Sequence, residues 1–313
     1  MAEKIKCLII GSGPAGYTAA IYAARANMYP VLYQGIQPGG QLTTTTDVEN
    51  FPGFEDPIQG PWLMEQMKKQ AEAYGTRIMN DYVLEVDFDK KIHCVKTEKD
   101  EFSSHTVIIA TGAKAKWLNI EGEEKFRGFG VSACATCDGF FYKNKNVAVV
   151  GGGNTAVEEA LFLSNLCNKV VLIHRRDQLR AEKILQDRLF EKKNVEFIWN
   201  SEVQKVLGDN EKKVITSIEI FDSKYNRKEI LNIDGFFVAI GHSPTTEIFH
   251  KKLKMDDEGY IFTDADSTKT SVDGVFAAGD VTDKVFRQAV TAAGMGCMSA
   301  LEAESFLTKK NLI

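Results

Sequence analysis

Residues 6–16 read KCLIIGSGPAG, a short apolar run that leads into a glycine-rich turn. The alanine-rich residues 17–27 that follow are typical of a helix. Strand, turn and helix in this order suit a dinucleotide, because the glycines permit a tight turn and let the backbone approach a pyrophosphate. Glycine-rich turns also occur for structural reasons, but one that directly follows a strand favours nucleotide binding.

The pattern returns at residues 146–156, which read NVAVVGGGNTA and precede a second predicted helix that ends near residue 166. Two such units in 313 residues predict an α/β fold with two Rossmann-like, three-layer dinucleotide-binding domains. A polar, charged connection runs from about residue 113 to 126, and a Gly-His exit follows the strand 236–240. We therefore expect a domain at 116–243 that is inserted into a discontinuous first domain, 1–115 and 244–313.

The residues after the second strand of each unit predict which nucleotide binds there. The strand 30–33 ends at Gln34, where such sites usually carry an acid for the ribose, and no Lys or Arg lies between residues 30 and 46. The end of this strand therefore suits a cofactor that has a pyrophosphate but no 2′-phosphate, and FAD is the common cofactor of this kind. The strand 170–173 is followed instead by His174, Arg175, Arg176 and Arg180. Guanidinium groups offer bidentate donors to a 2′-phosphate, which predicts NADPH; the alternative is a solvated basic helix start.

Two thiols lie one helical turn apart in the stretch 134–138, CATCD. Such a pair closes a small disulfide or supplies half of a zinc site. Zinc would need two further Cys or His ligands, and the other four cysteines are single and far apart. The position of the pair, just before the second glycine-rich turn, favours a redox role in which electrons pass from NADPH through FAD to a disulfide.

Composition excludes several classes of protein. The hydrophobic fraction of 44% and the charged fraction of 26% are ordinary for a globular chain, and a net charge of -5 with no basic stripe argues against nucleic-acid or membrane partners. Apolar runs are far shorter than the ~18 residues of a spanning helix. The run 5–10 lacks a cleavage site, so we interpret it as a strand and not as a signal peptide. Six cysteines are too sparse for a disulfide scaffold, which predicts a cytoplasmic protein.

Further elements follow from apolar runs and turn residues. We expect a helix at 60–74. The loop 35–41 either brings its backbone close to a flat ring or is an ordinary surface turn. Asp280 would accept a hydrogen bond from a flavin ribityl hydroxyl, and a helix over 287–309 would face the flavin with its first residues. The predicted strands are 83–88, 92–97, 106–110, four antiparallel strands at 195–199, 203–207, 214–221 and 228–233, then 236–240 and 275–278.

Five motifs occur in the order and spacing of the low-molecular-weight thioredoxin reductases, which the chain resembles over nearly its whole length. They are Gly11–Gly16, Cys134–Asp138, Gly151–Ala156, His174–Arg180 and Gly279–Asp280. The resemblance implies a thioredoxin-disulfide reductase that uses NADPH and FAD, with thioredoxin as its protein substrate. It also implies a homodimer and rotation of the two domains, for which 113–122 and 241–246 are candidate hinges.

The resemblance also implies roles for single residues. Cys137 is the thiol nearer the flavin, Cys134 attacks the partner disulfide and Asp138 supplies the proton, which requires burial to raise its pKa. We interpret His174 and His242 as structural or solvent-facing and not as acid-base groups. The expected flavin contacts are Gly11, Ser12, Gly13, Pro14, Ala15, Gln34, Gly35, Gly39, Gly40, Gln41, Asn50, Asp280, Arg287, Gln288 and Ala289. The expected NADPH contacts are Gly153, Asn154, Thr155, Glu158, His174, Arg175, Arg176, Arg180 and Ile240.

Other proteins with a similar scaffold differ in recognisable ways. A peroxiredoxin-reducing flavoprotein would add a module before Gly11, a flavodoxin or ferredoxin reductase would lack the thiol pair, and a dithiol oxidase would lack the arginine cluster. A nucleotide-sensing or zinc-binding protein would need no flavin. The remaining alternative is a related NADPH-dependent flavin disulfide reductase that acts on another thioredoxin-like protein or a peroxiredoxin system.

Overall fold

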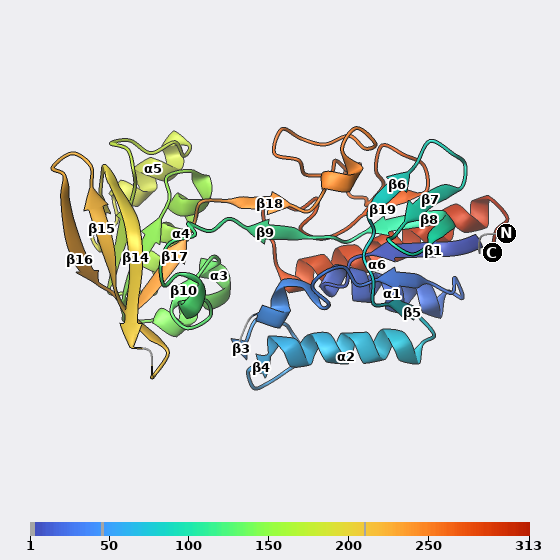
Figure 1. The fold of residues 1–313 in the computed structure, drawn as a ribbon, viewed down its shortest axis with the longest axis horizontal. Coiled ribbons are helices and arrows are strands. Elements are labelled where there is room, and N and C mark those ends of the chain that lie inside the picture. Colours follow the sequence, from blue (N-terminus) through green and yellow to red (C-terminus); the bar gives the residue numbers. More distant parts are fainter. Residues whose placement is uncertain (1–3, 45–46, 210) are drawn as a thin grey trace. The chain divides into compact units, whose positions relative to one another are not determined.

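The structure is a computed structural model that describes residues 4–44, 47–209 and 211–313 (Figure 1). The chain divides into two compact units: unit 1 comprises Met1–Lys114 and Ser243–Ile313, and unit 2 comprises Ala115–His242. The chain crosses between them in β9 (Ala113–Ala115) and β18 (His242–Pro244), which pair with each other. Unit 2 is therefore inserted into unit 1, and the predicted α/β class is confirmed.

Five parallel strands form the centre of unit 1. Their order is β5 (Arg77–Met79), β2 (Val31–Tyr33), β1 (Lys4–Ile10), β8 (Glu101–Ile109) and β19 (Val275–Ala277). The first half of β8 also pairs antiparallel with β7 (His93–Lys96), which pairs with β6 (Glu85–Asp87). A separate hairpin joins β3 (Asp47–Val48) to β4 (Ile58–Gln59).

Both faces of this sheet are covered, which explains the continuous apolar run of β1. Cys7 and Ile9 pack against a core formed with the helices α1 (Pro14–Arg25), α2 (Gly60–Ala73) and α6 (Ala289–Lys309). Leu8 and Ile10 point to the opposite face and pack with Val86, Val95 and Phe249. Alternate side chains therefore enter two cores, as the two-residue repeat of a strand requires.

Unit 2 repeats this plan with its own five parallel strands. Their order is β13 (Val195–Ile198), β12 (Lys169–Ile173), β11 (Asn146–Val150), β17 (Gly235–Val238) and β10 (Val131–Ser132). One face packs against the helices α3 (Ala135–Asp138), α4 (Asn154–Ser164) and α5 (Lys183–Phe190). The other face packs against an antiparallel sheet of β14 (Ser201–Asp209), β15 (Val214–Asp222) and β16 (Arg227–Asn232). Three layers result, as predicted.

Several predicted elements differ from the structure. The strand near 195–199 was predicted to be antiparallel, and that is wrong: β13 pairs parallel with β12, because α5 carries the chain back across the sheet. The stretch 174–182 is a loop, so the alternative of a basic helix start is also wrong. The helix α6 begins at Ala289 because Arg287 has a φ of +49° and Gln288 is the N-cap. The strand β5 and the helix α5 were not predicted.

Short 3-10 turns complete the described chain: η1 (Gly40–Thr44), η2 (Glu124–Phe126), η3 (Gly139–Tyr142) and η4 (Glu247–Phe249). Within the described ranges, no helix has the length and apolar character needed to cross a membrane. The functional candidates lie at the carboxyl ends of the parallel strands, the edge where open α/β sheets bind their ligands.

Candidate active site

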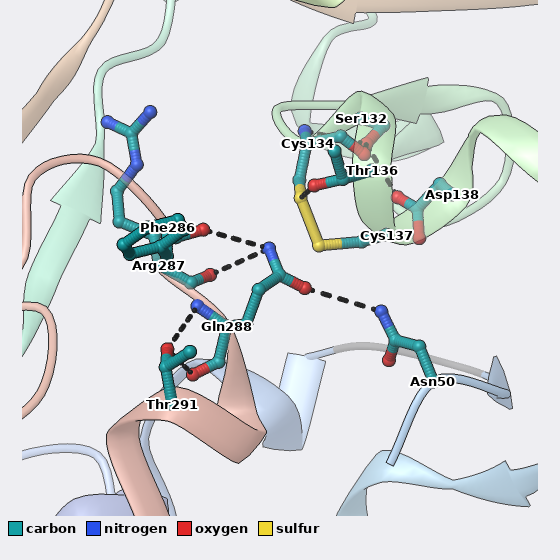
Figure 2. Close-up of a disulfide and its surroundings, with 10 residues drawn as sticks. All are labelled: Asn50, Ser132, Cys134, Thr136, Cys137, Asp138, Phe286, Arg287, Gln288 and Thr291. Atoms are coloured by element: carbon teal, nitrogen blue, oxygen red, sulfur yellow. Dashed lines mark hydrogen bonds between the residues drawn. A yellow bond between two sulfur atoms is a disulfide. The ribbon is translucent and has the colours of Figure 1, made fainter. Parts of the chain in front are cut away.

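Cys134 and Cys137 are joined by a disulfide, shown in Figure 2. Their Cα atoms are 5.3 Å apart, within the range that a disulfide spans. Cys134 is the N-cap of α3, a single helical turn that directly follows β10. Because residues three apart lie on the same side of a helical turn, the spacing brings the sulfurs together. Thr136 adds a hydroxyl 3.3 Å from the Cys134 sulfur.

Asp138 ends the same turn, and its carboxylate is held by a serine that the sequence analysis missed. Ser132 Oγ lies 2.5 Å from Asp138 Oδ2, as the dashed line in Figure 2 marks. Burial raises the pKa of the Asp138 carboxyl, and the hydrogen bond from Ser132 partly offsets this rise. The carboxyl group therefore keeps its proton above the usual range for Asp. Its place two residues before the first cysteine was the only available signal for Ser132.

The second glycine-rich turn forms an open cradle in unit 2. A Cβ on Gly151, which has a φ of +151°, would lie 2.4 Å from the Ala239 carbonyl oxygen, so only glycine fits there. Gly153 has open space around it and is the N-cap of α4, with no side chain capping the helix. The first N–H groups of α4 are therefore available to an anion. Asn154 instead bonds Glu182, with distances of 2.9 and 3.3 Å.

Three arginines lie beside this cradle. The side chains of Arg175, Arg176 and Arg180 are exposed, and within the described residues none forms a salt bridge. The Arg180 N–H donates to the Gly152 carbonyl at 2.6 Å, which fixes that arginine next to the turn. Guanidinium groups next to helix N–H donors offer the kind of hydrogen-bond donors that a doubly charged phosphate accepts from.

His174 lies below the same turn and is buried. A Cβ on Gly152 would be 2.2 Å from the imidazole Cε1, so the ring packs directly against the glycine. Burial lowers the pKa of His174, and the positive charge of Arg180, Arg176 and Arg175 lowers it further. No described group hydrogen-bonds its Nε2. A neutral, packed imidazole supports the turn and does not add to the positive charge around it.

The first glycine-rich turn is built in a similar way, but a hydroxyl and not an arginine cluster lies beside it. A Cβ on Gly11 would lie 2.3 Å from the Ala110 carbonyl oxygen, and Gly13 is open as the uncapped start of α1. Ser12 Oγ donates to the Gln34 carbonyl at 2.8 Å and accepts from the Gly39 N–H at 2.9 Å. These bonds hold the loop that carries Gly35, Gly39 and Gly40 against the turn.

Gln34 occupies the position where an acid was expected. Its side chain is buried, and its Nε2 donates to the Tyr17 hydroxyl at 2.8 Å. A carboxylate in this place could not donate to the Tyr17 hydroxyl as the amide does, and it would be a buried charge. The contact gives a physical reason for the missing acid, and Tyr17 is a second residue that the sequence analysis did not identify.

Asp280 follows β19 at the same edge of unit 1 as the first turn. Burial raises its pKa to about 7; the charge of Asp283 adds to the rise, whereas Arg287 opposes it. Within the described residues, no hydrogen bond reaches the Asp280 carboxylate. A Cβ on the preceding Gly279 would lie 3.0 Å from the Ala15 Cβ, so this strand end packs on the first turn of α1. The Asp280 carboxylate is therefore a hydrogen-bond acceptor for which no described residue supplies a donor.

The start of α6 brings together four of the expected residues in unit 1. The Asn50 amide donates to Gln288 Oε1 at 3.3 Å, and Gln288 Nε2 donates to the Phe286 carbonyl at 3.0 Å (Figure 2). Gln288 and Thr291 also form a capping box at the first turn of the helix. Arg287 and Ala289 flank Gln288 directly, so these residues converge on one helix start.

The remaining expected residues have more varied surroundings. The Gln41 side chain donates to the Ala113 carbonyl. Glu158 is exposed a turn into α4, and Ile240 is exposed just after β17. Asn154 is engaged by Glu182, which the sequence analysis did not identify. In residues 4–44, 47–209 and 211–313, no three His, Cys, Asp or Glu side chains gather as metal ligands.

Comparison with known proteins identifies one family whose members match the chain across both parallel sheets. The model of the family described as pyridine nucleotide-disulphide oxidoreductase matches residues 5–296. The chain belongs to this family. A thioredoxin reductase of Rickettsia conorii is 59% identical over 99% of this chain and 100% of its own length, and one of Coxiella burnetii is 51% identical over 97% of each. The resemblance inferred from the five motifs is confirmed.

Solved structures of the family agree with the fold. A crystal structure of a thioredoxin reductase from Streptococcus pyogenes superimposes with a TM-score of 0.93 at 41% identity, covering 99% of this chain and 100% of its own. The match spans both parallel sheets and the connections between them. It supports the α/β fold with two dinucleotide-binding domains, one inserted into the other.

Proposed function

We propose that this chain is an NADPH-dependent thioredoxin reductase that carries electrons through FAD and the Cys134–Cys137 disulfide to oxidised thioredoxin. One observation carries the proposal: the disulfide follows β10 at the carboxyl edge of the same sheet that bears the second glycine-rich turn and its arginines. In unit 2 the nucleotide-binding turn and the disulfide therefore lie at the same edge of one sheet. This arrangement supports dithiol–disulfide exchange in a member of this family. The names of the full-length relatives supply the protein substrate.

FAD fits unit 1 on the contacts of the first turn. Gly13 leaves space where a pyrophosphate would meet the uncapped start of α1. The Asp280 carboxylate, raised in pKa and without a described donor, would accept a hydrogen bond from a ribityl hydroxyl. The sequence has no arginine or lysine between residues 30 and 46 that would favour a 2′-phosphate after the second strand. The remaining expected flavin contacts, from Asn50 to the Arg287–Ala289 segment, belong to the same proposal.

NADPH fits unit 2 for complementary reasons. Gly153, Asn154 and Thr155 begin α4 over the open cradle, and the exposed arginines supply donors for a 2′-phosphate. When bound, the two cofactors supply hydride transfer from the nicotinamide and two electrons for the disulfide. The protein contributes position and charge. We assign Glu158 and Ile240 to the edge of this site on the resemblance alone.

The roles of the thiol pair follow from electron and proton balance. Reducing the disulfide takes two electrons and one proton, and it yields one thiol and one thiolate. Cys134, as the thiolate, attacks a sulfur of the thioredoxin disulfide and displaces the other sulfur as a thiolate. Asp138 gives its proton to that leaving sulfur. Cys137 then gives its proton to the Asp138 carboxylate and, as a thiolate, attacks the Cys134 sulfur of the mixed disulfide. The second thioredoxin sulfur leaves as a thiolate, and the Cys134–Cys137 bridge is restored.

The rotation implied by the family has a narrower candidate hinge than the sequence suggested. The Glu123 carboxylate accepts the N–H groups of Leu118 and Asn119 at 2.9 and 2.8 Å, which fixes that segment to unit 2. A Cβ on Gly122 would lie 2.1 Å from the Val206 carbonyl oxygen, so the segment also packs on β14. We therefore place the hinge in β9 and β18 and not in residues 117–122.

Two further features rest on the resemblance. We propose a homodimer, as implied by the family, and a cytoplasmic location. The free thiols among the described residues, Cys7, Cys94, Cys167 and Cys297, suit a reducing compartment. Sedimentation of the purified chain tests the oligomeric state directly.

The test of the function measures two steps separately: reduction of the flavin by NADPH and reduction of thioredoxin by the thiol pair. In Cys134→Ser and Cys137→Ser variants, NADPH still bleaches the flavin, but reduction of oxidised thioredoxin falls to background. The control is Cys94→Ser, because a hydroxyl there keeps the hydrogen bond that the Cys94 thiol donates to Glu101 at 2.9 Å. Assay against oxidised thioredoxins, glutaredoxins and small disulfides identifies the acceptor. Turnover with thioredoxin in either Ser variant refutes the relay.

A further inference from the structure

We propose that Ser132 is a positioning residue for the proton of thiol–disulfide exchange, because its hydroxyl satisfies the Asp138 carboxyl group both with and without its proton. The inference rests on the proposed function of Asp138 as the proton donor. Ser132 is 6% exposed and ends β10, so the sheet holds it in place. A buried hydroxyl on a strand therefore fixes the orientation of the flexible Asp138 side chain and the position of Cys134.

Ser132 Oγ is within hydrogen-bond distance of three groups. It accepts the Cys134 N–H at 3.0 Å, it lies 2.5 Å from Asp138 Oδ2, and it lies 3.3 Å from the Cys134 carbonyl oxygen. A serine hydroxyl has one hydrogen and two acceptor lone pairs. One lone pair is used by the Cys134 N–H. The single hydrogen therefore has two possible acceptors, Asp138 and the Cys134 carbonyl.

The two protonation states of Asp138 select between these acceptors. When Asp138 is ionised, the Ser132 hydroxyl donates to the carboxylate, and the Cys134 carbonyl keeps the bond from the Asp138 N–H at 3.1 Å. When Asp138 is protonated, its O–H donates to the free lone pair of Ser132, and the Ser132 hydrogen turns to the Cys134 carbonyl. Neither state leaves a buried polar group without a partner, which would cost about 1–3 kcal/mol.

The proton step follows from this arrangement without any electron reaching Ser132. The Cys134 thiolate forms a bond to one substrate sulfur while the substrate S–S bond breaks. The leaving thiolate takes the proton of Asp138 and becomes a thiol. Asp138 becomes a carboxylate, and the Ser132 hydrogen turns back from the Cys134 carbonyl to Asp138. The new negative charge therefore meets a hydrogen-bond donor as soon as it forms.

The titratable groups around Asp138 do not obscure this step. Burial, together with the charges of Asp138 and Asp234, raises the pKa of the η3 residue Tyr142 to about 12. Tyr142 is therefore neutral at every pH of interest. The two thiols of the reduced pair are also ionisable, and that of Cys134 supplies the readout.

The experiment measures how fast Cys134 of the chemically reduced, full-length holoprotein is alkylated by iodoacetamide between pH 5 and 9. In Ser132→Ala the inflection due to Asp138 moves to higher pH by about one unit, because the charge-assisted bond that the ionised carboxylate loses is stronger than the neutral bond that the protonated group loses. Ser132→Thr keeps the hydroxyl and the parent profile. Ser164→Ala is the control: the hydroxyl of this buried serine donates to the Leu161 carbonyl at 2.7 Å, and its variant shows no movement.

A double-mutant cycle shows whether Ser132 acts through Asp138. In the Asp138→Asn background the inflection is absent, and adding Ser132→Ala produces no further change. A parent profile in Ser132→Ala, or equal changes in both backgrounds, overturns the proposal. If the alanine variant does not fold, Ser132→Gly removes the same hydroxyl and is measured instead. The alkylation profile needs no thioredoxin, so the cycle can fail while thioredoxin reduction persists, and the reverse outcome is equally visible.

Discussion

Four strands of each parallel sheet share an order and a glycine-rich turn, but the fifth strand and the chemistry after it differ. That strand is β19 in unit 1, the last of its sheet along the chain, and β10 in unit 2, the first of its sheet along the chain. In each, the first glycine of the turn sits against the carbonyl of an alanine after the neighbouring strand, Ala110 in unit 1 and Ala239 in unit 2. The outermost parallel strand is followed by Asp280 in unit 1 and by Cys134 in unit 2. The shared backbone therefore decides where a ligand meets the sheet, and a few residues after the strands decide which ligand and which reaction.

The first prediction concerns the edge residue of unit 1. Raising the Asp280 pKa from 3.8 to about 7 costs the ionised state roughly 4 kcal/mol. The folded pKa lies above the unfolded one, so the stabilisation is complete below about pH 4 and is lost as the pH rises through 7. Asp280→Asn should therefore gain stability over the parent across this window, as measured by urea unfolding of the flavin-free chain.

The controls for this prediction isolate burial as the cause. Arg287, Asp283 and Tyr260 are the charged or titratable neighbours of Asp280, and all remain in the variant. Asp257→Asn changes an exposed carboxylate and should give the same small difference at every pH. A pH-independent difference for Asp280→Asn would mean that its carboxyl group is hydrated in the folded protein, and the parallel with the buried Asp138 edge would be lost.

The second prediction tests how similar the turns are. A Cβ on Gly16 would lie 2.0 Å from the Gly11 carbonyl oxygen, whereas unit 2 already carries Ala156 at the matching position. Gly16→Ala should cost about 3 kcal/mol by overpacking, and Ala156→Gly about 1 kcal/mol through lower helix propensity. Urea midpoints measure both.

Gly13→Ala is the matched control for Gly16→Ala, because its Cβ meets nothing within 4 Å and its φ is −69°. It should leave the stability nearly unchanged. Similar losses in the free energy of unfolding for Gly16→Ala and Ala156→Gly would contradict this prediction. The close contact with the Gly11 carbonyl would then not explain why residue 16 is a glycine.

Sequence patterns predicted the repeated scaffold because glycine turns after apolar strands leave local signals. They predicted the direction of β13 wrongly, since strand direction depends on where α5 returns the chain. They missed Tyr17 and Ser132, because a buried hydroxyl that holds another side chain has no periodicity or spacing of its own. The raised pKa values of Asp138 and Asp280 were also beyond the sequence, since burial comes from residues distant along the chain.

The last prediction concerns the arginines, the clearest difference between the second-strand ends. Replacing Arg175, Arg176 or Arg180 with Gln should each weaken NADPH binding about 10- to 100-fold, the loss of one charge-assisted hydrogen bond of about 1.5–3 kcal/mol. NADH lacks the 2′-phosphate, so its affinity should change little. Arg188→Gln removes an exposed arginine on α5 of the same unit and serves as the control. Equilibrium titration of both nucleotides makes the comparison. Equal losses for NADPH and NADH would assign these guanidinium groups to the pyrophosphate, and the charge difference between the two turns would then not explain the choice of nucleotide.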